Sequence, residues 1–75
     1  MTIKEYIKQN KKDLNYKDFI LYDYECDNKI IINKKGFYWF NDSKRVSKNI
    51  IKYYEGLTLL MSYNEGGVIF LQVNY

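Results

Sequence analysis

The sequence predicts a single α+β domain with the order α-β-β-β-α-β-β, in which two helices cover one face of an antiparallel sheet. Its 75 residues provide enough chain for one small core. Hydrophobic residues make up 47% of the chain and charged residues 28%, a balance typical of folded proteins. Apolar residues recur at helical spacing in two segments and at every second position in the others. We therefore treat residues 1–75 as one domain.

The first predicted helix covers roughly residues 3–13. Thr2, followed three residues later by Glu5, is the capping-box pattern, in which each side chain binds the free backbone amide of the other residue. Ile3 and Ile7 fall on one helical stripe, so we expect that stripe to face the core.

Residues 18–41 predict a meander of three antiparallel strands. Side chains alternate between two faces from Phe19 onward, which is the period of an extended strand. Asp27-Asn28 supplies one tight turn, and the run from Asn33 to Gly36 supplies the next.

A second helix is expected at roughly residues 43–55, because capping oxygens precede it and Gly56 follows it. The alternating period then returns, and Asn64-Glu65-Gly66-Gly67 predicts a hairpin turn into a closing strand over 68–75.

The sheet face away from the helices is expected to be only partly covered, and therefore to carry polar residues mixed with an apolar patch. The residues that we assign to this face are Asp23, Glu25, Thr58, Ser62, Gln72, Asn74, Phe19, Leu21, Leu60 and Phe70.

The residue inventory argues against an enzyme. The chain has no histidine and one cysteine, so it lacks an imidazole base, a zinc cluster and a disulfide framework. We interpret Cys26 as a small buried hydrophobe, and its isolation suggests a reducing, cytoplasmic compartment. No apolar run would span a membrane, and the first residues show no secretion signal. Asp23, Glu25 and Asp27 alternate and would share one face of a strand, where they could bind a metal ion. They fall at a predicted hairpin turn, however, so we favour a wetted strand face over a metal site. We expect no cofactor and no metal.

Four consecutive aromatic residues in the third strand place two rings on each face of the sheet. One pair should belong to the core, while the other is either covered or exposed for recognition. Rings next to basic residues suit a protein hot spot, and they also suit stacking of single-stranded nucleic acid. The residues that we predict to bind a partner protein are Tyr38, Trp39, Phe40, Lys44 and Arg45.

The first turn of the second helix is expected to contain Lys44 and Arg45. Positive side chains are unfavourable at that end of a helix, whereas an anion bound there would be favourable. An anion site at this helix end is therefore one hypothesis, and simple surface lysines are the other.

The chain has a net charge of +3 from 12 basic and 9 acidic residues, which permits a nucleic-acid partner without requiring one. Lysine, isoleucine, asparagine and tyrosine are abundant while alanine and proline are absent, which is the usage expected of an AT-rich genome. In this profile the chain resembles small accessory proteins of phages and mobile elements, including inhibitors of host enzymes and anti-CRISPR proteins.

The chain has more aromatic residues than a small core needs and no catalytic groups. Together with the resemblance, this predicts a non-enzymatic protein that modulates or inhibits a host protein machine, or a protein–nucleic acid complex, through a protein–protein surface. The alternative is a small nucleic-acid-binding module that uses the aromatic strand. The basic residues assigned to this alternative are Lys34, Lys35 and Lys48. A homodimer formed through the partly apolar sheet face is compatible with either function.

Overall fold

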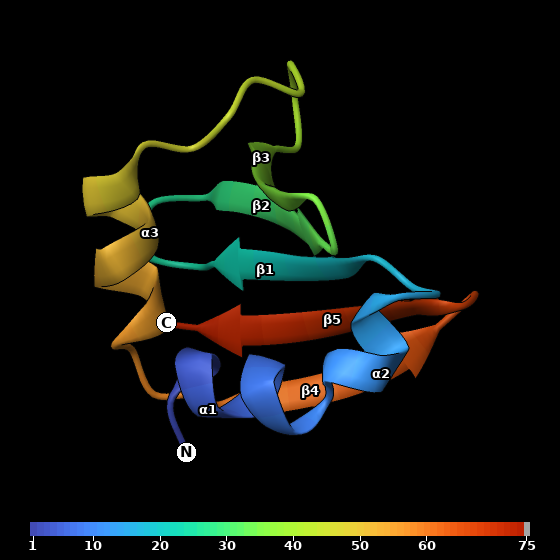
Figure 1. The fold of residues 1–75 in the computed structure, drawn as a ribbon. Helices are drawn as coiled ribbons and strands as arrows, with labels where there is room; N and C mark the ends of the chain where they lie inside the picture. The colour runs from blue at the N-terminus through green and yellow to red at the C-terminus, as the bar shows by residue number, and fades with distance from the viewer. Residues whose placement is uncertain (75) are drawn as a thin grey trace.

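The computed structural model describes residues 1–74 and confirms the α+β class and the order of the elements, apart from a division of the first helix. The first two helices cover one face of a five-stranded sheet, and the third helix lies at one end of the strands, where it packs against the same core (Figure 1). The strands are β1 (Phe19–Asp23), β2 (Asn28–Asn33), β3 (Gly36–Trp39), β4 (Met61–Glu65) and β5 (Val68–Val73). The helices are α1 (Ile3–Gln9), α2 (Lys11–Leu14) and α3 (Lys48–Glu55). Within residues 1–74, no helix is long and apolar enough to cross a membrane.

The strand order is β3-β2-β1-β5-β4, and the sheet is mixed rather than wholly antiparallel as predicted. β1 and β5 run parallel at the centre, with Phe19 opposite Ile69, and their arrowheads both point toward α3 in Figure 1. The parallel pair results from the way the chain connects the first three strands to the last two. The chain leaves β3 through α3, forms the edge strand β4 and turns back as β5, which inserts between β4 and β1.

The capping box at the N-terminus is confirmed. The Thr2 amide donates to Glu5 Oε1 at 2.8 Å, and the Glu5 amide donates to the Thr2 hydroxyl at 3.2 Å. The predicted helix 3–13 is divided, because Asn10 leaves helical geometry at φ −113° and ψ 29°. The Asn10 side chain donates to the Tyr6 carbonyl at 2.9 Å, which shows how asparagine competes with regular helix geometry.

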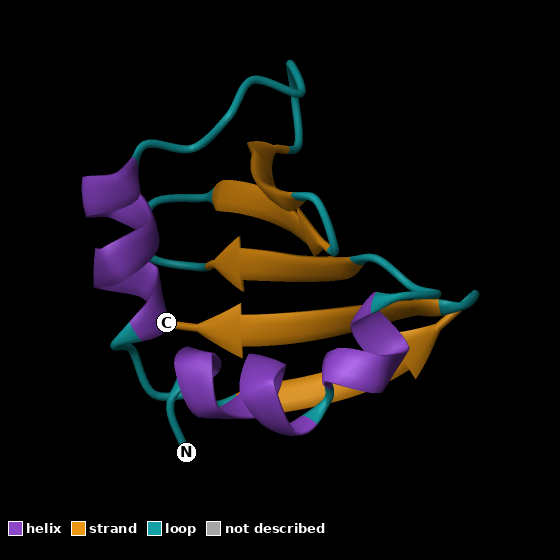
Figure 2. Cartoon of the chain, viewed as in Figure 1, coloured by secondary structure: helices purple, strands orange, loops and turns teal. Residues whose placement is uncertain are grey.

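The helix expected at 43–55 begins later than predicted. Ser47 caps α3 by accepting from the Ile50 amide at 3.4 Å, while Ser43 has a positive φ of 60° that ends any helix there. The loop from residue 40 to residue 47 instead arches from β3 to α3 (Figure 2). The Trp39 amide donates to the Lys44 carbonyl at 2.8 Å, so this loop lies along the outer side of β3.

The core forms between the helices and one face of the sheet. It corrects the predicted assignment of faces on β1, whereas Phe70 and Gln72 of β5 lie on the open face as predicted. Phe19 and Leu21 are buried against the helices, whereas Ile20 and Tyr22 face the open side. Alternation indicates which residues share a face, but both sets on β1 are apolar and the pattern could not say which set meets the helices. The buried hydrophobic residues are Ile3, Phe19, Leu21, Ile30, Ile32, Val46, Tyr54, Ile69, Leu71 and Val73.

Asp23 lies at the end of β1 within this core and is 1% exposed, although the sequence suggested a wetted position. The Tyr54 hydroxyl donates to its Oδ2 at 2.6 Å, and the Asn74 amide donates to its Oδ1 at 3.3 Å. The backbone amides of Glu25 and Cys26 donate to the same Oδ1 at 3.0 and 3.4 Å. Asp23 therefore links β1, the following turn, α3 and the residue after β5.

These hydrogen bonds shift the pKa values of Asp23 and Tyr54. Burial raises the pKa of Asp23, but the hydrogen bonds from Tyr54, Asn74 and the turn amides outweigh it and hold the pKa below its ordinary value. Burial, with the hydrogen bond to Asp23, raises the pKa of Tyr54 to about 12. At neutral pH the carboxylate is charged and the phenol is protonated, as the hydrogen bond requires.

We expect acid to destabilise the protein through Asp23. Because its pKa is lower in the folded than in the unfolded chain, its contribution is complete above the ordinary value of 3.8 and is lost as pH falls through the folded pKa. Urea unfolding of the wild type and of Asp23→Asn, measured from pH 6 to pH 2, checks this. The difference in free energy of unfolding between the two proteins should shrink over the acidic end of the range. A difference that stays constant would contradict the expectation.

Candidate functional site

The open face of the sheet contains a shallow hollow of about 280 Å³, here called the open-face hollow. Strands β1, β2, β4 and β5 and the residue after β3 all contribute side chains to it. Its lining residues are Ile20, Tyr22, Tyr24, Lys29, Phe40, Tyr63, Phe70, Leu71 and Gln72.

Two stacked pairs of rings shape the open-face hollow. The rings of Tyr22 and Tyr24 stack with centroids 4.1 Å apart. Tyr63 and Phe70 are cross-strand partners in the β4–β5 hairpin, and their rings stack at 5.1 Å. Because stacking against a neighbour limits ring rotation, these side chains present apolar area that is already ordered before a ligand binds.

Lys29 is the charged residue among those that line the hollow. Its ammonium lies 5.2 Å from the centroid of the Tyr22 ring and 5.4 Å from that of the Phe40 ring, which is cation–π geometry. The Tyr22 hydroxyl donates to Asp27, and this hydrogen bond raises the pKa of Tyr22 above its ordinary value. The hollow thus combines apolar rings with one positive charge, the Lys29 ammonium, which lies over two of those rings.

Several large apolar residues on this side of the sheet remain in contact with water. Tyr24 is 47% exposed, Phe40 44% and Tyr63 43%, and Met61 on the same face is 54% exposed. Scattered exposed apolar residues are ordinary, but rings gathered around one hollow form the kind of patch that marks an interaction site.

The structure separates the residues that we predicted to bind a partner protein. Phe40 lines the open-face hollow, and Tyr38 lies half-buried with the Arg45 guanidinium 5.4 Å above its ring. Trp39 packs against the core on the helix face. Lys44 is exposed in the loop after β3, so neither it nor Arg45 lies in the first turn of a helix, and the prediction that they do is wrong.

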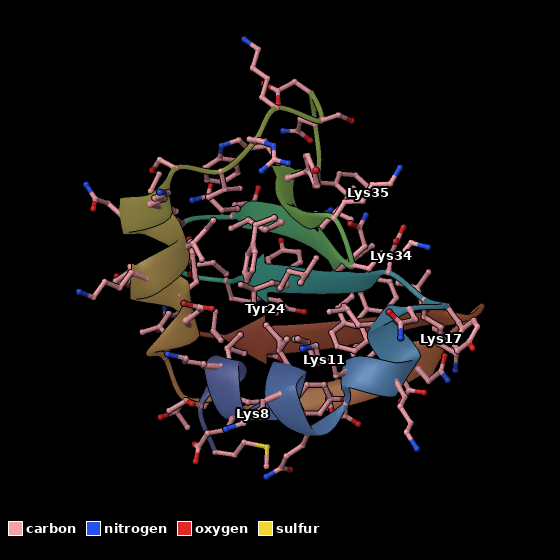
Figure 3. The ribbon with its side chains drawn as sticks, in the orientation of Figure 1. Lys8, Lys11, Lys17, Tyr24, Lys34 and Lys35 are labelled. Carbon is pink, nitrogen blue, oxygen red and sulfur yellow. The ribbon has the colours of Figure 1, made fainter. Side chains whose placement is uncertain are left out.

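The residues of the nucleic-acid alternative are separated in the same way. Lys34 and Lys35 occupy the turn between β2 and β3, on the same side of the molecule as Lys17 (Figure 3). Together with Lys17 and Tyr16 they line a second hollow of about 200 Å³. Lys48 begins α3, which Figure 1 places at the other end of β2. Lys17 and Tyr16 are the neighbours of this basic hollow that the sequence analysis missed.

The residues of the open-face hollow that the sequence analysis missed are Ile20, Tyr22, Tyr24, Lys29, Tyr63 and Leu71. The spacing of Tyr22 and Tyr24 shows that they share one face of β1. What brings Tyr63 close to them is the parallel pairing of β1 with β5, which has no signal in the local pattern.

The turn that follows β1 contains Glu25, Asp27 and the single cysteine, Cys26. Cys26 is exposed rather than buried as expected, because the turn places it outside the sheet. The nearby charge of Asp23 raises the pKa of the Cys26 thiol, so it stays protonated at neutral pH and is a poor nucleophile. In the part of the chain that the structure describes, no group of three potential ligands could hold a metal ion.

Comparison with known proteins adds no assignment. No protein-family model matches the chain, and neither curated proteins nor solved structures gave a similar one.

Proposed function

We propose that this protein is a non-catalytic binding protein that engages a partner protein through the open face of its sheet. The observation that supports this is the open-face hollow, in which ordered rings around a cation remain exposed although a separate core is complete. The biological role that we propose for this binding is inhibition or modulation of a host protein machine. A cytoplasmic location is part of it, because an exposed thiol suits a reducing compartment.

The chemistry of the hollow describes the partner. An apolar side chain of the partner fits against the rings of Tyr24, Tyr63 and Phe70, where it displaces water from apolar surface. Lys29, held over its two rings, favours a carboxylate next to that side chain. The partner segment that best fits is therefore an aromatic or aliphatic residue beside an aspartate or glutamate.

A second candidate is nucleic-acid binding, and one observation favours it. Lys17, Lys34 and Lys35 border one hollow with Tyr16, whose ring is 88% exposed. Such cations suit phosphates, and a free ring suits base stacking. Rings and cations are fewer there than a single-strand platform uses, so we place this candidate second.

Affinity capture from a low-GC bacterial lysate tests the proposal. Immobilised wild type should retain a discrete protein in the presence of nuclease, and the Tyr24→Ala/Tyr63→Ala variant should lose it. Tyr16→Ala is the matched control, because it removes an exposed tyrosine outside the hollow and should retain the protein. Capture that requires nucleic acid and is lost in Tyr16→Ala or Lys34→Gln/Lys35→Gln would instead support the second candidate.

A further inference from the structure

The two edges of the sheet differ in how they are covered. Along β3, the Trp39 amide donates to the Lys44 carbonyl at 2.8 Å and the Val46 amide to the Phe37 carbonyl at 3.0 Å, so the loop covers that edge. Residues 57–59, which precede β4, are covered by the N-terminal residues 1–3. β4 itself is the other outer strand, and no other segment of residues 1–74 pairs with its outer side.

Between its two ends, the β4 edge has few of the features that usually prevent strands from associating. It contains no proline and no lysine, and Glu65 at its end is its one charged residue. All five of its residues are exposed, including the large apolar Met61 and Tyr63. A bulge occurs only at its start, where the Leu60 amide also reaches the Gln72 carbonyl opposite Met61.

The turn after β4 determines which backbone groups point outward. Gly66 and Gly67 have φ of 61° and 79°, the left-handed values of a two-residue hairpin turn, so Glu65 and Val68 form a hydrogen-bonded pair. Hydrogen-bonded pairs alternate along an antiparallel ladder, and Tyr63 is therefore bonded to β5 as well. The N–H and C=O groups of Ser62 and Asn64 consequently point away from the sheet.

We propose that a second copy of this chain adds to the β4 edge, in an antiparallel pair with a two-fold axis at Tyr63. Ser62 then exchanges backbone hydrogen bonds with Asn64 of the partner subunit. The Glu65 carboxylates lie at opposite ends of the pair, where they do not repel one another. The Tyr63 rings of the two copies become neighbours on the open face, so each copy borders the hollow of the other.

This proposal goes beyond the proposed function and needs no partner protein for its test. A pair of five-residue strands buries little area, so we expect a dimer that forms with rising concentration rather than a permanent one. Sedimentation velocity of the wild type from micromolar to millimolar protein should show a monomer giving way to a dimer.

The decisive variant is Ser62→Pro, because Ser62 directs its N–H outward and proline on an edge strand can leave the β4–β5 ladder intact. The dissociation constant of the variant dimer should rise roughly tenfold to a hundredfold, because each subunit loses the hydrogen bond that its Ser62 amide donates to the other subunit. Ser62→Ala keeps the amide and should dimerise like the wild type. Asn64→Lys provides a second test that does not depend on proline, because a lysine is a usual block on an edge strand.

Three results would overturn the proposal. One is a wild type that remains monomeric throughout the concentration range. Another is a folded Ser62→Pro variant, verified by circular dichroism, that associates as strongly as the wild type. The third is an Asn64→Lys variant with unchanged association.

Discussion

Replacing Asp23 by alanine is expected to lower the free energy of unfolding by about 3 kcal/mol. The substitution leaves the buried Tyr54 hydroxyl and the side chain of Asn74 without their acceptor, together with the two turn amides. A domain of this length has a total stability of roughly 4–11 kcal/mol, so the loss is a large share of it. Urea unfolding at pH 7, followed by circular dichroism, measures the difference.

Tyr54→Phe is the matched control for this experiment. It removes the hydroxyl that donates to Asp23 and keeps the ring in the core, so its cost should be smaller, about 1–2 kcal/mol. A loss below about 1 kcal/mol in Asp23→Ala would show that the four hydrogen bonds to Asp23 do not stabilise the fold.

The second large effect is expected on partner binding. Tyr24→Ala/Tyr63→Ala removes two exposed rings of the open-face hollow and should weaken the complex with the captured protein about a hundredfold, as loss of aromatic anchors does at other interfaces. Lys29→Gln should weaken it roughly fivefold to tenfold, because the carboxylate of the partner loses its cation. Titration calorimetry with the purified partner gives both values.

Tyr16→Ala and Lys12→Gln are the controls for this titration, since neither residue lines the hollow. Both should bind with the affinity of the wild type. Increasing salt should weaken binding only modestly, because in the proposed complex rings rather than phosphate contacts hold the partner. A double variant that binds as tightly as the wild type would contradict the proposed site.

The local pattern of the sequence was sufficient to predict the elements and their order, apart from the division of the first helix at Asn10. The capping box of Thr2 and Glu5 and the hairpin at Gly66-Gly67 are formed by residues near one another in the chain, and both lie where the pattern placed them. The late start of α3 was missed because Ser43 and Ser47 are both suitable caps. The loop hydrogen bonds to β3, which decide between them, are long-range contacts.

The candidate site could be predicted only in part, for the same physical reason. Phe40 was expected at a binding surface and lines the open-face hollow, whereas the adjacent Trp39 faces the core. Strand alternation separates neighbours of this kind without assigning their faces. The remaining rings converge because β5 inserts beside β1, and tertiary pairing of this kind has no counterpart in residue spacing.

The most direct test of the central claim is to map the contact itself. Backbone amide shifts of ¹⁵N-labelled protein, followed during addition of the captured partner, report which residues meet it. Binding at the open face predicts the largest changes at residues that line the open-face hollow, such as Tyr24, Lys29 and Phe70, and small changes at Tyr16 and Lys34. Changes centred on Tyr16, Lys34 and Lys35, with an unaffected open face, would contradict the account.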